Sequence, residues 1–367
     1  MKIPLIKPYI TDDIKKRVLE VLDSGYLTEG PVTHEFEKAF ASYVNATYAI
    51  AVTSCTTGLE IALRAIGIGP GDEVIVPDYT YPATASVIAL VGAHCVIVDI
   101  DPASMLIDYD LIEASITPNT KAIIPVSLFG NPLDYDRLKD IKNKYNIYII
   151  EDAACSIGAE YFGAKVGTFS DISVFSLHPR KFITTGEGGM ITTENPDWAN
   201  WMNSYKHFGM EMTNESREGI HFNMTGTNYK LTNIQAAIGL GQLKQIDILL
   251  ENRRNLAAKY DKLLNNIKGI ALPLIVPGGQ HSYQSYCILT SSRDKILKIL
   301  RSEGIEVQIG TYSLHMHKAF QNELLYSLNG PFKGSQTAYS HCLALPLFYG
   351  LKTEEQDFIV ERIKELI

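Results

Sequence analysis

The chain has 367 residues, of which 46% are hydrophobic and 20% are charged. This length fits one large and one small domain, and the ordinary composition excludes disordered, collagen-like and repeat proteins. The formal net charge of −8, with no basic stripe, argues against nucleic acid as the main partner, although a local pocket can still bind an anionic small molecule.

The sequence has no segment that predicts export, membrane insertion or metal binding. The longest apolar stretch, residues 83–98, is interrupted by polar residues and falls short of the ~20 residues that span a bilayer. The N-terminus lacks the apolar core of a signal peptide. The five cysteines are an odd number without CxxC spacing, so we expect free thiols, no zinc site and a cytoplasmic location.

Short apolar runs alternate with helix-like segments from residue 12 to about residue 240. The run 120–127 has little polar alternation, as expected for a strand buried on both faces. The alternation predicts an α/β fold in which helices flank a mainly parallel central sheet. In chain order we expect helices at 12–22, 31–43, from 57, at 83–91 and at 133–145, and strands at 47–54, 73–77, 94–101, 120–127, 147–154, 171–177 and 188–194.

The last third of the chain has a different pattern. A long amphipathic helix is expected from about Thr232 to Leu264, and prolines and glycines then separate it from the C-terminal segment. A strand at 281–290 and helices at 294–304 and 353–367 are expected after that break. We therefore predict a large domain over 12–245 and a smaller α+β domain made of 246–367 together with 1–11.

Polar clusters stand at the ends of several predicted strands, which is where open α/β sheets bind ligands. Thr56 and Thr57 follow the first strand and begin a helix, whose exposed N–H groups and dipole suit a phosphate. Taken alone, this cluster is better explained as an ordinary helix N-cap. Asp152 closes the strand that begins at Ile147, and it could keep a pyridine nitrogen protonated or equally cap the next element.

Lys181 lies in a turn just after the strand at 171–177, ahead of a glycine-rich stretch. Burial there would lower the pKa of the amine and free it for Schiff-base chemistry. Most lysines are solvated, so it is the neighbouring clusters that single this one out. In the same turn Ser176 is a candidate phosphate donor and His178 a candidate substrate contact. Tyr81 could stack on a flat heterocycle, although core packing is a strong alternative for one of 20 tyrosines.

Five segments, taken in order along the chain, resemble motifs of the DegT/StrS family of sugar aminotransferases, which depend on pyridoxal phosphate (PLP). They are TSCTTGLEIAL, PDYTYPATAS, IIEDAACSIGAE, FSLHPRKFITTGEGGMITT and GTNYKLTNIQAAIGLGQL. The resemblance extends to both ends of the chain. It implies a fold-type I aminotransferase that forms a homodimer with PLP at the subunit interface.

The resemblance also implies roles for single residues. Lys181 matches the lysine that carries the aldehyde as a Schiff base, and Asp152 matches the partner of the pyridine nitrogen. The residues that match the family's other cofactor contacts are Tyr81 for the ring and Thr56, Thr57, Ser176 and, from the other subunit, Asn228 for the phosphate. By its own sequence, Asn228 could equally cap the helix that follows it.

Two positions depart from the family pattern. Cys155 stands where the family commonly has His or Gln near the cofactor, so a hydrogen bond there is weakened or replaced. Lys230 stands where Arg is more usual, which removes a bidentate contact. The family's dehydratases have His in place of the Schiff-base lysine, so the presence of Lys181 favours transamination.

The activity implied by the resemblance is transfer of an amino group, through an aldimine on Lys181, from L-glutamate to a nucleotide-linked keto-deoxy sugar. Such amino sugars serve surface polysaccharides or secondary metabolites. A PLP-dependent sugar dehydratase and a non-catalytic PLP-fold regulator are the alternatives. By position, substrate contacts are expected from His178, Tyr312, His315 and the loop 25–30, although His315 is slightly better explained as a packed or hydrogen-bonded histidine.

Overall fold

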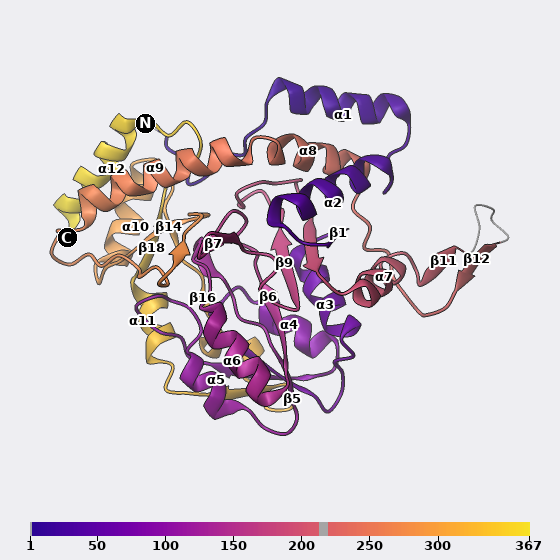
Figure 1. Ribbon diagram of the computed structural model, residues 1–367. Coiled ribbons are helices and arrows are strands. Elements are labelled where there is room, and N and C mark those ends of the chain that lie inside the picture. Colours follow the sequence, from indigo (N-terminus) through magenta and orange to yellow (C-terminus); the bar gives the residue numbers. More distant parts are fainter. Residues whose placement is uncertain (1, 213–218) are drawn as a thin grey trace.

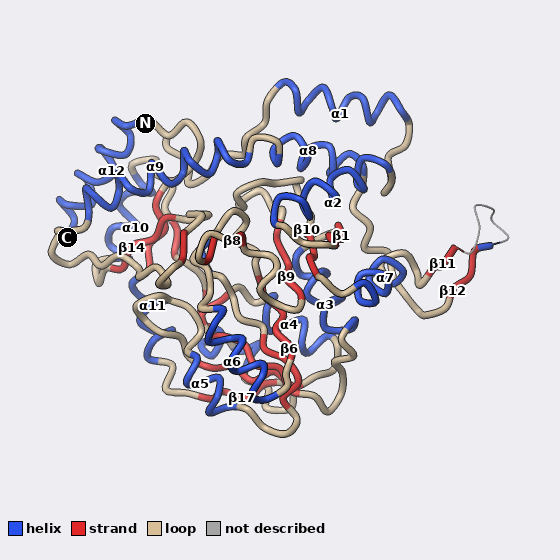
Figure 2. The backbone as a smooth tube through the Cα atoms, viewed as in Figure 1, coloured by secondary structure: helices blue, strands red, loops and turns tan. Residues whose placement is uncertain are grey.

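The computed structural model of the chain describes residues 2–212 and 219–367. Its centre is an eight-stranded sheet in the order β1-β10-β9-β6-β5-β2-β4-β17 (Figures 1 and 2). Only β10 runs antiparallel to its neighbours, so the predicted mainly parallel sheet is confirmed. The strands are β1 (Tyr48–Val52), β2 (Glu73–Pro77), β4 (His94–Val98), β5 (Thr120–Ile123), β6 (Tyr148–Asp152), β9 (Ile172–Ser176), β10 (Gly189–Thr193) and β17 (Tyr326–Asn329).

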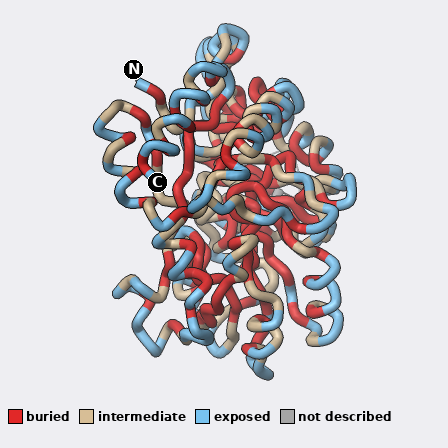
Figure 3. The backbone as a smooth tube through the Cα atoms, turned by 90° about the vertical axis from the view of Figure 1, so that its left-hand side faces the viewer, coloured by how far each residue is buried: buried red, intermediate tan, exposed pale blue. Residues whose placement is uncertain are grey.

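Helices cover both faces of this sheet. Successive strand residues point to opposite sides, so one strand packs against the helices on both faces. In β2, Val74 and Val76 join the apolar cluster of α3, α4 and α7, while Ile75 joins that of α2 and α6. Burial on both faces explains the unbroken apolar run in the sequence. Figure 3 shows the buried residues gathered in the interior. The helices are α1 (Asp12–Ser24), α2 (Pro31–Val44), α3 (Cys55–Ala65), α4 (Ala83–Leu90), α5 (Tyr109–Ser115), α6 (Tyr135–Tyr145) and α7 (Pro196–Tyr205).

The long helix expected from Thr232 to Leu264 is two helices, α8 (Asn233–Leu243) and α9 (Ile246–Leu264). The start of α8 and the end of α9 agree with the predicted limits of the single helix. Thr232 caps α8 through a capping box with Gln235. The chain leaves helical geometry at Gln245, with φ −110° and ψ 8°. Two glycines of α8 let neighbouring helices approach closely, since a Cβ at Gly239 would lie 2.6 Å from Phe36 of α2 and one at Gly241 2.6 Å from Ile14 of α1.

The C-terminal segment forms a second, smaller body around β14 (Tyr286–Leu289), β18 (Cys342–Leu345) and β15 (Gln308–Ile309). Its apolar cluster includes Ile3, so the first residues pack with this segment. The same segment also returns to the central sheet, where β17 pairs with β4 and β16 (Tyr312–Ser313) pairs with β3 (Tyr79–Thr80). The domain division at residue 245 stays a prediction. The helices here are α10 (Arg293–Ser302), α11 (Lys333–His341) and α12 (Thr353–Leu366).

A two-stranded ribbon projects from the body of the protein next to α7 (Figure 1). It consists of β11 (Met210–Met212) and β12 (Ile220–Phe222), and Phe222 on it is exposed. A further small sheet consists of β7 (Glu160–Tyr161), β8 (Ala164–Lys165) and β13 (Gly279–Gln280). Among residues 2–212 and 219–367, no helix is long and apolar enough to cross a membrane.

Candidate active site

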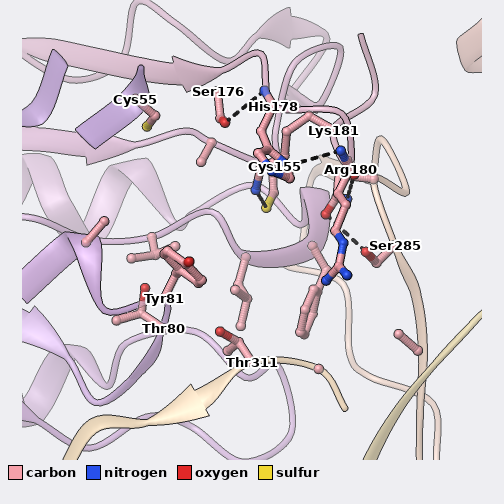
Figure 4. Close-up of a pocket in the computed structure, with 18 of the residues that line it drawn as sticks. Cys55, Thr80, Tyr81, Cys155, Ser176, His178, Arg180, Lys181, Ser285 and Thr311 are labelled. Atoms are coloured by element: carbon pink, nitrogen blue, oxygen red, sulfur yellow. Dashed lines mark hydrogen bonds between the residues drawn. The ribbon is translucent and has the colours of Figure 1, made fainter. Parts of the chain in front are cut away.

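A cavity of about 670 Å³ opens at the carboxyl ends of the sheet strands. Residues at or just beyond the ends of β1, β6 and β9 line it, including Thr56, Asp152, Ser176 and Lys181. Residues 308–312 of the C-terminal segment close another side (Figure 4). Clusters that are far apart in the sequence therefore meet at one edge of the sheet, as the parallel topology requires.

Asp152 is a buried carboxylate, with 5% of its surface exposed. Its Oδ2 accepts a hydrogen bond from Thr84 Oγ1 at 2.8 Å, and its Oδ1 accepts one from the Ala154 N–H at 3.2 Å. Burial raises the pKa of Asp152, although the Thr84 hydroxyl and the charge of Lys181 oppose that rise. Within the described part of the chain, no cation lies within 4.0 Å of this carboxylate. A protonated ring nitrogen would provide the missing partner.

The amine of Lys181 points into the same cavity and donates to Cys155 Sγ at 3.1 Å (Figure 4). Its backbone is fixed by a hydrogen bond from the Lys181 N–H to the His178 carbonyl at 2.8 Å. Burial favours the neutral amine, but the attraction of Cys155 and Asp152 outweighs it and raises the pKa of Lys181. The sequence-based expectation of a lowered pKa is therefore wrong for the cofactor-free chain, because it considered burial without these two partners.

The N-terminus of α3 forms another wall of the cavity. Ser54 caps this helix through a reciprocal pair of hydrogen bonds with Thr57, so the Thr57 side chain is engaged in capping and does not line the cavity. Thr56 and, from the end of β9, Ser176 do line it. Gly189 lets β10 pass close by, because a Cβ there would lie 2.6 Å from the Ser54 carbonyl. Hydroxyls and free N–H groups at a helix N-terminus suit a phosphate.

The cavity therefore holds a donor set that fits PLP. An amine can bond to its aldehyde, a buried carboxylate lacking a cation can face its ring nitrogen, and a hydroxyl-rich helix start can take its phosphate. On another side, Tyr81 presents an exposed ring whose centroid lies 6.2 Å from that of Tyr312. Both tyrosines and His178 line the cavity.

The loop 25–30 and two further candidates lie outside the cavity lining. Asn228 is exposed, and its backbone forms an isolated antiparallel β-bridge with His207. It does not line the cavity of its own chain. His315 is held elsewhere, with its Nδ1 2.7 Å from Asp78 Oδ2 and its ring stacked on Phe332. These contacts make His315 part of a buried polar cluster that joins β16 to the end of β2.

Three residues of the site, Thr84, Cys55 and Arg180, were not expected from the sequence. Thr84 reaches Asp152 from the first turn of α4, and Cys55 Sγ lies 3.9 Å from Asp152 Oδ1. No local pattern marks either contact, because each depends on the packing of a helix against a distant strand. Arg180 lines the cavity, and its place directly before Lys181 was the available signal.

Comparisons with known proteins agree with this geometry. Residues 8–364 match the model of the DegT/DnrJ/EryC1/StrS aminotransferase family. The chain is similar to GDP-perosamine synthase of Caulobacter vibrioides, at 36% identity over 100% of this chain and 98% of that protein. It is also similar to the spore coat polysaccharide biosynthesis protein SpsC of Bacillus subtilis, at 33% identity over 100% of this chain and 97% of the relative.

A solved structure has the same fold. Spr1654 from Streptococcus pneumoniae, in its PLP form, is 31% identical, with a TM-score of 0.92 over 100% of this chain and 98% of that chain. The fold-type I aminotransferase architecture expected from the resemblance is thereby confirmed. On the strength of the family match and of these relatives, the chain belongs to the DegT/DnrJ/EryC1/StrS aminotransferase family.

Proposed function

We propose that this aminotransferase uses PLP to move an amino group from L-glutamate onto a nucleotide-linked keto-deoxy sugar. The observation that carries the proposal is the meeting of Lys181, Asp152 and the N-terminus of α3 in one cavity. The names of two relatives, a GDP-perosamine synthase and a spore coat polysaccharide biosynthesis protein, support a sugar acceptor carried by a nucleotide.

The donor set determines which residues would hold the cofactor. Asp152 would face the ring nitrogen and keep it protonated, while Thr84 and the Ala154 N–H orient the carboxylate. Thr56, Ser176 and the first N–H groups of α3 would take the phosphate, and Tyr81 would cover one face of the ring. When bound, PLP supplies an aldehyde that carries the amino group and a ring that accepts electrons from the substrate carbon.

Lys181 is the residue that moves protons. Its Nζ takes the α-proton of the donor in the first half-reaction and delivers a proton to the acceptor's carbonyl carbon in the second. Cys155, 3.1 Å away, positions this amine. A lysine at this position favours transamination over the dehydration carried out by family members that have histidine there.

The proposal includes a homodimer with shared sites and a cytoplasmic location. Asn228 is exposed and outside the cavity of its own chain, which is consistent with a phosphate contact from Asn228 of the partner subunit. Exposed apolar residues on α1 and on the β11–β12 ribbon offer surface for such an interface, namely Leu19, Leu22 and Phe222. All five cysteines are free, which supports a reducing compartment.

The test is a pair of half-reactions on purified protein loaded with PLP. L-Glutamate alone should convert the cofactor to its amine form with release of 2-oxoglutarate. A panel of nucleotide-linked 3-keto and 4-keto sugars should then return it to the aldehyde form and yield an amino sugar. A deoxy-keto sugar formed without amine transfer would indicate a dehydratase. Binding of PLP without any conversion by glutamate would indicate a regulator.

A further inference from the structure

Arg180 is the one arginine within residues 2–212 and 219–367 whose guanidinium has no hydrogen-bond or ion-pair partner. Each of the other described arginines has its head group engaged by a carboxylate, an amide oxygen or a backbone carbonyl. Because an arginine is always charged and presents five donors in a fixed plane, its head group is suited to an oxyanion.

This free guanidinium belongs to the wall of the active-site cavity. Arg180 is exposed, lines the cavity and directly precedes Lys181 (Figure 4). Asp152 and Glu187 are the carboxylates of the lining, and neither forms an ion pair with Arg180: Asp152 accepts from Thr84, and Glu187 lies 3.9 Å from His178. The cavity wall therefore holds a guanidinium that is paired with neither carboxylate, next to the reactive amine, although the whole chain is acidic.

The backbone of Arg180 is held firmly, which fixes where its side chain begins. Its N–H donates to His178 Nδ1 at 3.1 Å, and its carbonyl accepts from Gln284 Nε2 at 2.7 Å. Gln284 is itself fixed, because the buried Arg253 donates to its carbonyl at 2.8 Å and also lies over the Phe182 ring. The guanidinium is therefore presented from a rigid turn, as a binding group should be.

We propose that Arg180 binds the anionic group of a substrate and so places the reacting carbon at Lys181 Nζ. This inference rests on the proposed function, in which both substrates carry oxyanions: the donor a carboxylate next to its reacting carbon, and the acceptor a diphosphate. Ser176, the candidate phosphate contact, and Arg180 are separate members of the cavity lining, and Figure 4 labels both.

The experiment compares Arg180→Gln and Arg180→Lys with the wild type and with Arg137→Gln as the control. Arg137 is also partly exposed and pairs with Asp110 on the outer surface, away from the cavity. One arm measures how the rate of the glutamate half-reaction depends on L-glutamate concentration. The other measures the dissociation constant of GDP for the PLP-loaded protein by calorimetry. PLP affinity is measured by absorbance titration.

In Arg180→Gln, either the L-glutamate concentration needed for the half-maximal rate or the dissociation constant of GDP should rise at least tenfold, since a hydrogen-bonded charge pair is lost. Arg180→Lys should lie between it and the wild type, because a lysine keeps the charge without the planar fork. In the control Arg137→Gln, both quantities should stay within twofold of the wild-type values. Loss in the glutamate arm alone assigns the anion to a carboxylate, and loss in the GDP arm alone assigns it to the diphosphate.

Changes below twofold in both arms would overturn the proposal. A loss confined to PLP affinity would overturn it as well, because the guanidinium would then bind the cofactor and not a substrate. Weakened GDP binding in a protein whose wild type transfers no amine would support Arg180 as the anion site while refuting the aminotransferase proposal. A wild type that neither reacts with glutamate nor binds GDP would refute both.

Discussion

Replacing Asp152 with Asn should slow catalysis strongly while leaving the cofactor-free fold nearly as stable as before. The carboxylate accepts hydrogen bonds from Thr84 and from the Ala154 N–H, and burial raises its pKa. An asparagine can still accept from Thr84, but its NH₂ then faces the Ala154 N–H, which costs about 1 kcal/mol. Relief from burying a charge offsets that loss, so we expect a net change of no more than about 1 kcal/mol.

The catalytic loss should be much larger, because the variant removes one member of a buried ion pair with the ring nitrogen. Losing such a partner costs about 3–4 kcal/mol, which corresponds to a fall of roughly 10²–10³-fold in rate. The assay is the glutamate half-reaction under single-turnover conditions, with urea unfolding of the cofactor-free protein alongside. A fall of less than tenfold, or destabilisation by more than about 3 kcal/mol, would rule out this role for Asp152.

A matched variant separates charge from geometry at the same site. Thr84→Val keeps the carboxylate but removes the hydroxyl that lowers its pKa. The pKa of Asp152 should therefore rise further, and the acidic limb of the rate–pH profile should move to higher pH. Because Asp152→Asn has no carboxylate to titrate, its profile should lack that limb. An identical acidic limb in Thr84→Val and the wild type would show that Asp152 does not control it.

Three further predictions concern Cys155, Glu151 and Asn228. Cys155→Ala removes the partner that raises the pKa of Lys181, so the rate of PLP association should reach its plateau at lower pH. An unchanged pH profile would show that the Cys155 contact does not control the pKa of Lys181. Burial raises the pKa of Glu151 to about 7 from an ordinary 4.5, so stability should fall as pH rises between these values. Relative to Glu151→Gln, the loss should reach about 3 kcal/mol in urea titrations, and a parallel pH dependence of the two proteins would contradict it. Mixing inactive Lys181→Ala with impaired Asn228→Ala should restore activity, because hybrid dimers contain one intact site; no recovery would place Asn228 outside the partner's site.

Much of the fold could be predicted because its signals are local. Apolar runs bounded by turns marked the sheet strands, and Thr232 with Gln235 marked the start of α8. The break at Gln245 could not be predicted, because residues 242–248 contain no proline or glycine. The return of β17 to the sheet edge was also missed, because its pairing with β4 joins residues that are far apart in sequence.

The candidate site shows the same limit. Lys181 and Asp152 could be found because each stands at the end of a buried strand, where the topology gathers ligand-binding groups. The partners that determine their protonation could not, since the contacts from Thr84 and Cys155 depend on side-chain packing. His315 was ambiguous for the same reason, because its tie to Asp78 is a tertiary contact.

The most direct measurement is to load the wild type with PLP, reduce it with borohydride, digest it and locate the pyridoxyl group by mass spectrometry. We expect a single labelled peptide with the modification on Lys181, and no label when Lys181→Ala is treated in the same way. A pyridoxyl group on another lysine, or label retained by Lys181→Ala, would contradict the assignment of Lys181 as the Schiff-base residue.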